Sequence, residues 1–229
     1  MMKFTDKPHY LQHRQRLRER FRTTGFDGFQ DYEALELLLT YAIPRMDVKP
    51  LAKELISRFG SFSSALDASR DELAEVKGIK ENTAVLLSVV KECARLYLKE
   101  GLKKKKHITS TRELLDYCKL TMSGLKDEQF MAIFLNSQNE VIADEVIQEG
   151  TVNQSVVYPR KVMERAIYHK ASSLIVVHNH PGGSSKPSAE DKRLTNQLIG
   201  AGRSLGINIH DHLIISKAGH FSFLEAGMM

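Results

Sequence analysis

Two histidines stand two residues apart in the segment HNHPGGSSKPSAED, which runs from residue 178 to residue 191. They end the run SSLIVVHNH, whose apolar character predicts a buried strand over residues 172–180. Because side chains alternate along a strand, His178 and His180 would point to the same face at its C-terminal end. Two imidazoles on one face suit zinc, which binds histidine nitrogen and carboxylate oxygen. Asp191, in the first turn of the next predicted helix, could supply the carboxylate.

The same residues also allow an ordinary structural interpretation. In SAED, Ser188 and the acid of Asp191 three residues later have the pattern of a capping box at the start of a helix. An exposed histidine, likewise, is usually an ordinary surface residue. These two explanations account for the parts of the motif separately, and they leave its spacing as a coincidence.

The spacing of the motif distinguishes the two interpretations. H-x-H, seven residues and then S-x-x-D resembles the JAMM (MPN-type) metalloprotease signature at every fixed position. The wider sequence resembles the RadC family of bacterial proteins (UPF0758-like), a JAMM-like branch. This wider resemblance covers nearly the whole chain from about residue 10, and it is carried by the stretches DYEALELLLTYAIPRMDVKPLAKELISRFGS, GTVNQSVVYPRKV, HNHPGGSSKPSAED and INIHDHLIIS.

The resemblance implies a cytidine-deaminase-like α/β fold, a helix-sheet-helix JAMM domain, with one zinc ion per chain. It implies that His178, His180 and Asp191 hold the zinc and that a water takes the fourth position. Ser188 would position this water or stabilise the developing oxyanion. Zinc lowers the pKa of a bound water toward about 7, and an upstream glutamate would take its remaining proton and return it to the leaving amine.

The glutamate is expected just before an early strand of the domain. In KDEQFMAIFLN, Glu128 immediately precedes the apolar run, so it is the residue that we predict as the acid–base group. Glu145 and Glu149 are the competing candidates, and both are more simply interpreted as solvent-facing strand or turn residues. Sequence alone leaves this choice open.

The N-terminal part of the chain has helical periodicity over residues of about 8–100. One charged helix is expected to end at Gly25, and a second to begin with Asp31 as its N-cap. A third would have Asp47 as its N-cap and Gly60 just past its end. A short helix, a turn and a longer amphipathic helix follow. This pattern predicts an all-α region.

A run of like charge, KKKKH, separates this region from the rest of the chain. Such a block is most simply a solvated linker, and a basic tether is the alternative. We therefore predict a helical domain over residues 1–102, a linker over 103–107 and a zinc domain over 108–229. In the last part strands and helices alternate, which predicts a sheet covered by helices.

The segment ELAEVKGIKENTA resembles a helix-hairpin-helix element, whose glycine-containing turn presents backbone amides to a phosphate. Lys77, Gly78 and Lys80 are the candidate nucleic-acid contacts, and Lys103–Lys106 could add charge. The second glycine usual in this element is replaced by Lys80. A helical packing module is the alternative, and no aromatic residues interleave with the lysines to stack on bases.

Composition restricts the remaining possibilities. The chain has 229 residues, 42% hydrophobic residues and a net charge of +5, which is ordinary for a globular protein. It has no apolar run long enough for a membrane span, and its basic N-terminus lacks the apolar segment of a secretory signal. Cys93 and Cys118 are the two cysteines, so no disulfide framework is available and a cytoplasmic location is expected.

Two functions compete on these grounds. One is a zinc-dependent hydrolase that acts on a peptide or isopeptide substrate. The other is a DNA-associated module of repair or recombination, with weak non-specific DNA binding and a non-catalytic zinc. Three ligands favour the enzyme, because a structural zinc normally has four protein ligands.

Three other motif interpretations are set aside. A zinc deaminase would need H-x-E and P-C-x-x-C, which the sequence lacks. The literal tripeptide HNH does not make an HNH nuclease, because those enzymes spread their residues over a longer hairpin. The tripeptide HDH at residues 210–212 is expected to begin a strand, with His212 lining the site or packing, and it receives no function.

Overall fold

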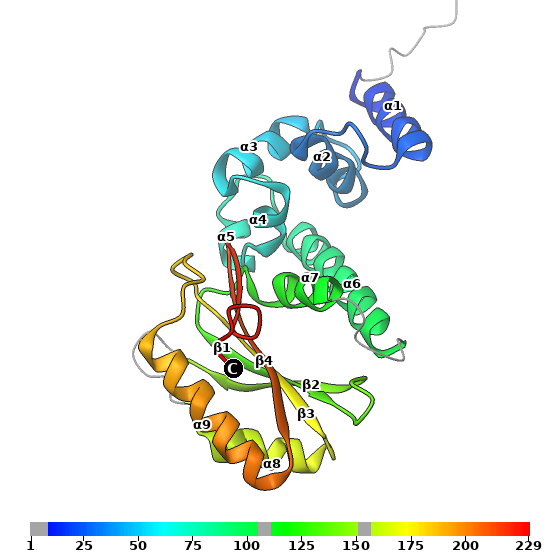
Figure 1. The fold of residues 1–229 in the computed structure, drawn as a ribbon. Helices are drawn as coiled ribbons and strands as arrows, with labels where there is room; N and C mark the ends of the chain where they lie inside the picture. Colours follow the sequence, from blue (N-terminus) through cyan, green and yellow to red (C-terminus); the bar gives the residue numbers. More distant parts are fainter. Residues whose placement is uncertain (1–8, 105–110, 151–156) are drawn as a thin grey trace, which may run out of the picture. The chain divides into compact units, whose positions relative to one another are not determined.

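The structure of the chain is a computed structural model that describes residues 9–104, 111–150 and 157–229 (Figure 1). The chain divides into two compact units, Met1–Cys93 and Ala94–Met229.

The division falls inside helix α6 (Glu81–Lys104). This helix includes Lys103 and Lys104, so the predicted basic linker begins within a helix. Residues 105–107 of that linker lie outside the described residues. The boundary between the two predicted domains therefore stays a prediction.

The N-terminal unit is built from helices, as its sequence periodicity predicts. Its elements are α1 (His9–Thr24), α2 (Asp31–Ala42), α3 (Lys49–Phe59), α4 (Phe62–Asp67), α5 (Arg70–Ala74) and the first part of α6. The apolar faces of α2 to α6 meet in one core, which includes Leu35, Leu39, Leu55, Leu73 and Leu87. Gly25 and Gly60 follow α1 and α3 with φ angles of 62° and 91°, which is the left-handed conformation expected after a helix.

The predicted N-caps of α2 and α3 are each displaced by one residue. Gln30 caps α2 through a capping box, so Asp31 is the first helical residue, and its carboxylate accepts a hydrogen bond from the N–H of Phe62 instead. Val48 is the N-cap of α3, and the Asp47 carboxylate accepts from the N–H two residues later. Both aspartates still satisfy backbone donors. Asp47 does so within a local turn, which the sequence does not distinguish from a cap, whereas Asp31 does so at the start of α4, 31 residues away.

The C-terminal unit contains a five-stranded mixed sheet with the order β2-β1-β3-β4-β5. Its strands are β1 (Gln129–Leu135), β2 (Val141–Glu149), β3 (Ser173–Asn179), β4 (Asn208–Ser216) and β5 (Gly219–Ser222). Neighbouring strands are antiparallel except β3 and β4, which are parallel. The last predicted strand is shorter than its sequence suggests, because it ends at Ser222 and the chain then turns.

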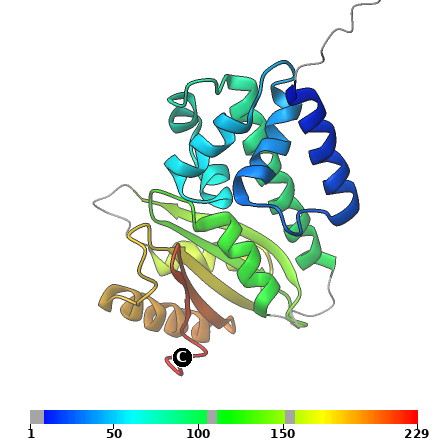
Figure 2. The ribbon, with the colours of Figure 1, turned by 90° about the horizontal axis from the view of Figure 1, so that it is seen from above.

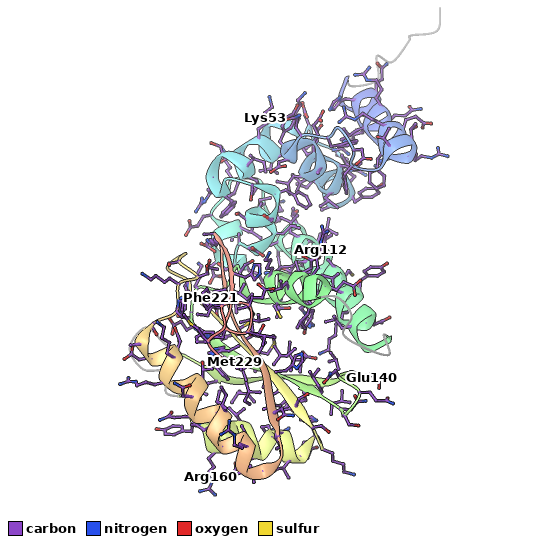
Figure 3. All side chains as sticks on the ribbon, viewed as in Figure 1. Lys53, Arg112, Glu140, Arg160, Phe221 and Met229 are labelled. Carbon is purple, nitrogen blue, oxygen red and sulfur yellow. The ribbon has the colours of Figure 1, made fainter. Side chains whose placement is uncertain are left out.

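Helices cover both faces of the sheet in this unit. Helix α7 (Thr111–Met122) packs on one face, and α8 (Pro159–Tyr168) and α9 (Ala189–Leu205) pack on the other (Figures 1 and 2). Apolar residues fill the two interfaces, whereas on the outer side of α8 Arg160 is directed away from the sheet (Figure 3). The predicted helix-sheet-helix architecture is confirmed.

The central position of β3 explains the sequence of that strand. It is paired with β1 on one side and β4 on the other, and all seven of its residues are buried. A strand covered on both faces needs apolar residues at nearly every position, which accounts for the run SSLIVV. Among the described residues, no helix is long and apolar enough to span a bilayer.

Candidate metal site

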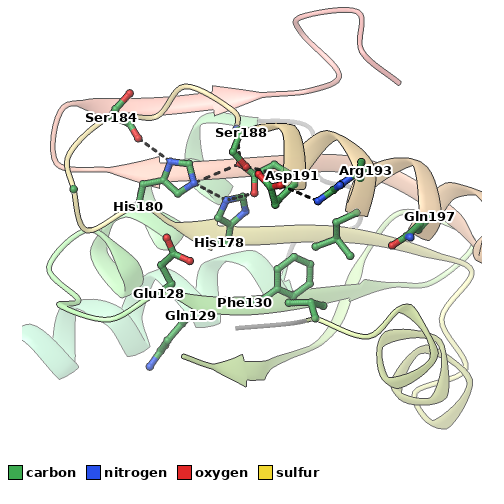
Figure 4. A pocket seen from close by; sticks show the side chains of 14 residues that line it. Glu128, Gln129, Phe130, His178, His180, Ser184, Ser188, Asp191, Arg193 and Gln197 are labelled. Atoms are coloured by element: carbon green, nitrogen blue, oxygen red, sulfur yellow. Dashed lines mark hydrogen bonds and ion pairs between the residues drawn. The ribbon is translucent and has the colours of Figure 1, made fainter. Parts of the chain in front are cut away.

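Three side chains converge where β3 ends and α9 begins (Figure 4). The Nε2 atoms of His178 and His180 lie 3.0 Å apart. One carboxylate oxygen of Asp191 lies 3.2 Å from the first of these atoms, and the other lies 3.6 Å from the second. A tetrahedral zinc with bonds of about 2.0–2.2 Å would place its ligand atoms roughly 3.3–3.6 Å apart. The donor set suits zinc, and two of the three distances are slightly shorter than this range.

Strand alternation places the two histidines as predicted. His178 is buried on the face that α8 and α9 cover, where it follows Leu174 and Val176. His180 lies just past the end of the strand, because the strand ends one residue earlier than the sequence suggests. Its N–H still donates to the carbonyl of Ile215 over 2.8 Å, which continues the parallel pairing with β4 and keeps the ring beside its neighbour.

The start of α9 brings the carboxylate to the histidines. Ser188 is the N-cap, and its backbone N–H and its hydroxyl both donate to one Asp191 oxygen over 2.7 Å. The Asp191 N–H donates back to the serine hydroxyl over 3.1 Å. The capping box therefore forms, and the same carboxylate faces the histidines. The two interpretations of SAED describe a single arrangement.

A carbonyl group orients the ring of His180. Its Nδ1 lies 2.8 Å from the backbone oxygen of Ser184 in the loop after β3. A carbonyl oxygen only accepts, so Nδ1 carries the hydrogen and Nε2 of the neutral ring presents its lone pair toward His178 and Asp191. This arrangement, a ring N–H given to a carbonyl, is the usual support of a metal-binding histidine.

The electrostatics of the group are those of a site that favours a cation. Burial alone would raise the pKa of Asp191, but hydrogen bonds with His178 and His180 outweigh it and hold the pKa far below its ordinary range. The hydrogen bond with Asp191 raises the pKa of His180. The carboxylate therefore stays ionised, and positive charge between these groups is stabilised.

Glu128 borders the same pocket, which has a volume of about 810 Å³. It directly precedes β1, as predicted, and its carboxylate points toward the two histidines, whereas the next side chain, Gln129, points away (Figure 4). The other lining residues include Phe130, Val157, Ser188, Asp191 and Leu194. The pocket thus has an apolar wall beside the His-His-Asp group and one further carboxylate at its edge.

The backbone around Glu128 is fixed by the middle residue of the HNH tripeptide. Asn179 is buried on the opposite face from the histidines. Its side chain accepts a hydrogen bond from the N–H of Gln129 over 2.8 Å and donates to the carbonyl of Asp127 over 3.0 Å. The carbonyl of Glu128 itself accepts from the N–H of Gly150. Nothing in the local sequence around Asn179 indicates this role, because both of its partners lie about 50 residues away.

The two competing glutamates lie on β2. The carboxylate of Glu145 receives two hydrogen bonds of 2.6 Å from Arg165 and lies 2.8 Å from a ring nitrogen of His169. The hydrogen bonds with Arg165 are the main cause that lowers its pKa to about 2. Glu149 is exposed and accepts from the side chain of Gln129. Neither residue lines the pocket.

His212 is a further residue beside the site that the sequence analysis left without a function. It lies in β4, is fully buried, and its Nε2 is 2.9 Å from Nδ1 of His178. Its Nδ1 is 2.7 Å from the hydroxyl of Thr195 in α9. Burial lowers its pKa well below the ordinary value.

The candidate nucleic-acid contacts lie in the N-terminal unit. Lys77, Gly78 and Lys80 are exposed in the turn between α5 and α6, and Gly78 has a φ of 103°. The turn at this glycine is confirmed, and contact with nucleic acid stays a prediction. The side chains of Lys103–Lys106 lie outside the described part of the chain.

A mixed five-stranded sheet between helical layers, with a His-His-Asp group at the end of its third strand, is the arrangement of a JAB (MPN-type) domain. The model of the RadC-like JAB domain matches residues 108–228. A second model, the UPF0758 N-terminal domain, matches residues 9–85. The chain belongs to the RadC family, as its motifs predict, with a JAB domain that follows an all-α region.

Proposed function

We propose that the chain is a zinc-dependent metallohydrolase of the JAMM type, which hydrolyses a peptide or isopeptide bond. The observation that carries the proposal is the meeting of His178, His180 and Asp191 beside the Glu128 carboxylate in one pocket. Zinc held by the first three residues would polarise a carbonyl group and activate a water for attack on it. Its family membership is consistent with this chemistry.

Glu128 would act as the acid–base group. It would accept a proton from the attacking water as the new carbon–oxygen bond forms, and return it to the leaving nitrogen as the carbon–nitrogen bond breaks. The products are a carboxylate and an amine. Its position at the pocket and the binding of Glu145 to Arg165 support this choice between the two glutamates.

Ser188 would support the reaction through its hydrogen bond to Asp191. Its hydroxyl proton is directed to Asp191, so its first effect would be to orient that carboxylate. Support of the oxyanion by this hydroxyl, as the resemblance implies, would require the proton to turn into the pocket. Phe130, Val157 and Leu194 would exclude water from one side of the substrate.

The test combines metal analysis with hydrolysis of a library of peptide and isopeptide substrates by the full chain. The wild type is expected to bind about one zinc per chain and to cleave a subset of the library. Glu128→Gln should keep the zinc and lose about 10²–10⁴-fold in rate, because an amide does not accept the proton. Asp191→Asn should lose zinc affinity, because a neutral amide is a weaker ligand than a carboxylate.

Glu145→Gln serves as the control, because it removes a carboxylate of the same unit outside the pocket. It should retain both zinc and hydrolysis. If this variant lost hydrolysis and Glu128→Gln did not, the acid–base group would be Glu145 instead of Glu128. Full zinc occupancy in a His180→Ala variant would contradict the metal site.

A further inference from the structure

A chain of three hydrogen bonds leads from the backbone of α9 to the metal-facing ring of His178. The hydroxyl of Thr195 lies 2.6 Å from the carbonyl oxygen of Asp191 and 2.7 Å from Nδ1 of His212. Nε2 of His212 lies 2.9 Å from Nδ1 of His178. The side chains of Thr195, His212 and His178 are all buried, so water does not compete for these hydrogen bonds.

The rings in this chain are held in place by aromatic packing. Phe223 stacks on His212 with centroids 4.8 Å apart and an interplanar angle of 13°. Phe130 meets the same ring edge-on, and it stacks on His178 with an interplanar angle of 15°. The orientation of both imidazoles is therefore fixed before any ligand binds.

The backbone carbonyl of Asp191 determines the direction of all three hydrogen bonds. A carbonyl oxygen only accepts, so the single hydroxyl proton of Thr195 is donated to Asp191. The hydroxyl oxygen then accepts from Nδ1 of His212, which must carry a hydrogen. In a neutral imidazole the other nitrogen is an acceptor, so Nε2 of His212 accepts from Nδ1 of His178.

This direction leaves the lone pair of His178 on Nε2, which faces Nε2 of His180 at 3.0 Å. The carbonyl of Ser184 independently leaves the lone pair of His180 on the same atom. Two lone pairs at this distance repel each other unless a cation lies between them. With the opposite direction, Nε2–H of His178 would donate to His180, and a neutral hydrogen bond would close the site.

We propose that Thr195 and His212 are positioning residues that select the metal-binding tautomer of His178. The inference rests on the metal site of the proposed function and extends it to two residues that do not touch the metal. A metal-bound histidine usually gives its second N–H to a carboxylate, carbonyl or water. Here a second histidine receives it, and the hydroxyl of Thr195 leaves the lone pair of that ring on Nε2, where it can accept the hydrogen bond.

The tautomer of His212 can be measured without metal or substrate. Long-range ¹H–¹⁵N spectra of the imidazoles in the metal-free full chain should show hydrogen on Nδ1 and a lone pair on Nε2 of His212. Thr195→Ser keeps the hydroxyl and should give the same pattern. Thr195→Val removes it, so His212 should shift to the tautomer with hydrogen on Nε2.

Zinc affinity provides the second measurement, by competition with a chelator. Thr195→Val should weaken zinc binding about 10–100-fold, the usual effect of removing an outer partner of a metal ligand. Thr195→Ser should remain near the wild type. Thr121→Val is the matched control, because its hydroxyl also donates to a carbonyl four residues earlier, over 2.7 Å in α7, but has no bond to an imidazole. It should bind zinc like the wild type.

Hydrogen on Nε2 of His212 in the wild type would overturn the inference, and so would wild-type zinc affinity in folded Thr195→Val. If this variant did not fold, the spectra of the wild type and of Thr195→Ser would still decide. Failure of the wild type to bind zinc would refute the metal site of the proposed function. In that case the tautomer measurement would still decide whether the hydrogen-bond chain has the inferred direction.

Discussion

The side chain of Asn179 holds the peptide groups on both sides of Glu128. It accepts from the N–H of Gln129 and donates to the carbonyl of Asp127. Because one of these partners only donates and the other only accepts, the orientation of the amide group is determined. The tripeptide HNH thus directs two rings to the metal site from one face and fixes the neighbouring acid from the other.

Asn179→Asp should separate metal binding from catalysis. The substitution keeps the shape of the side chain but places a carboxylate oxygen against the carbonyl of Asp127, so the donated bond is lost. We expect the free energy of unfolding to fall by about 1–3 kcal/mol, as for other buried groups left without a partner. Hydrolysis should fall because Glu128 is displaced, whereas zinc content should be retained.

Urea denaturation, metal analysis and rate measurements on the same preparations check this prediction. Asn208→Asp is the control, because it makes the same change at an exposed position at the start of β4. Equal stability and equal rates in the two variants would show that the amide of Asn179 does not hold the acid in place.

Two substitutions of Ser188 should divide its capping role from its role at the carboxylate. Ser188→Ala is expected to cost about 1 kcal/mol in unfolding free energy, whereas Ser188→Gly should cost only a few tenths. Both remove the hydroxyl that donates to Asp191, so both should weaken zinc binding to a similar extent. If the loss of zinc affinity followed the loss of stability instead, the hydroxyl would act only as a cap.

The ion pair of Glu145 should make stability depend on pH in acid. Its pKa is lowered from 4.5 to about 2, chiefly by hydrogen bonds with Arg165, so the folded state favours the ionised form. The stabilisation is therefore fully present above pH 4.5 and is lost as the pH falls toward 2. Glu145→Gln should be less stable than the wild type at pH 7, and the difference should shrink as the solution becomes more acidic.

Urea denaturation at a series of pH values measures this difference. The control is Glu164→Gln, which removes an exposed acid that pairs with Arg160 along one helix. That variant should differ little from the wild type at any pH, because exposed pairs contribute little to stability. A constant gap between Glu145→Gln and the wild type from pH 7 to strong acid would contradict the assignment.

Two glycines of α9 should respond in opposite directions to alanine. A Cβ at Gly202 would lie 2.3 Å from the carbonyl oxygen of Ile207, so Gly202→Ala must displace the connection to β4 and destabilise the protein. At Gly200 nothing lies within 4 Å of the added atom. Gly200→Ala should therefore stabilise the helix by about 0.5–1 kcal/mol. Melting temperatures of the two variants test whether Gly202 lies this close to the carbonyl of Ile207. If both substitutions shifted the melting temperature in the same direction, this close contact would be refuted.

Much of the fold and the metal group could be predicted because their signals are local. Strand alternation places His178 and His180 on one face, and the helix start carries Asp191 within the same short segment. The same applies to the glycines that end α1 and α3. The N-caps were predicted less well. At Asp47 a turn and a cap have the same local pattern, and at Asp31 the carboxylate binds the N–H of the distant Phe62.

The supporting residues could not be predicted because their partners are distant in the sequence. His212 reaches His178 only because β4 pairs with β3 in parallel, in a register that opposes His178 to Ile214 and turns His212 to the same face. The preference for Glu128 over Glu145 likewise depends on Arg165, which α8 supplies across the sheet face. Neither the contact between His212 and His178 nor that between Arg165 and Glu145 can be recognised from the local sequence around either partner.

The residues of the His-His-Asp group all lie within residues 178–191, whereas Glu128 directly precedes another strand, β1. Mutations in evolution can therefore change Glu128 without changing the His-His-Asp group. A single base change converts a glutamate codon into a glutamine codon, so under the proposed function a lineage could lose hydrolysis in one step and keep the His-His-Asp group and the pocket. Two family members with equal metal content could then be an enzyme and a binding protein, and residue 128 would tell them apart.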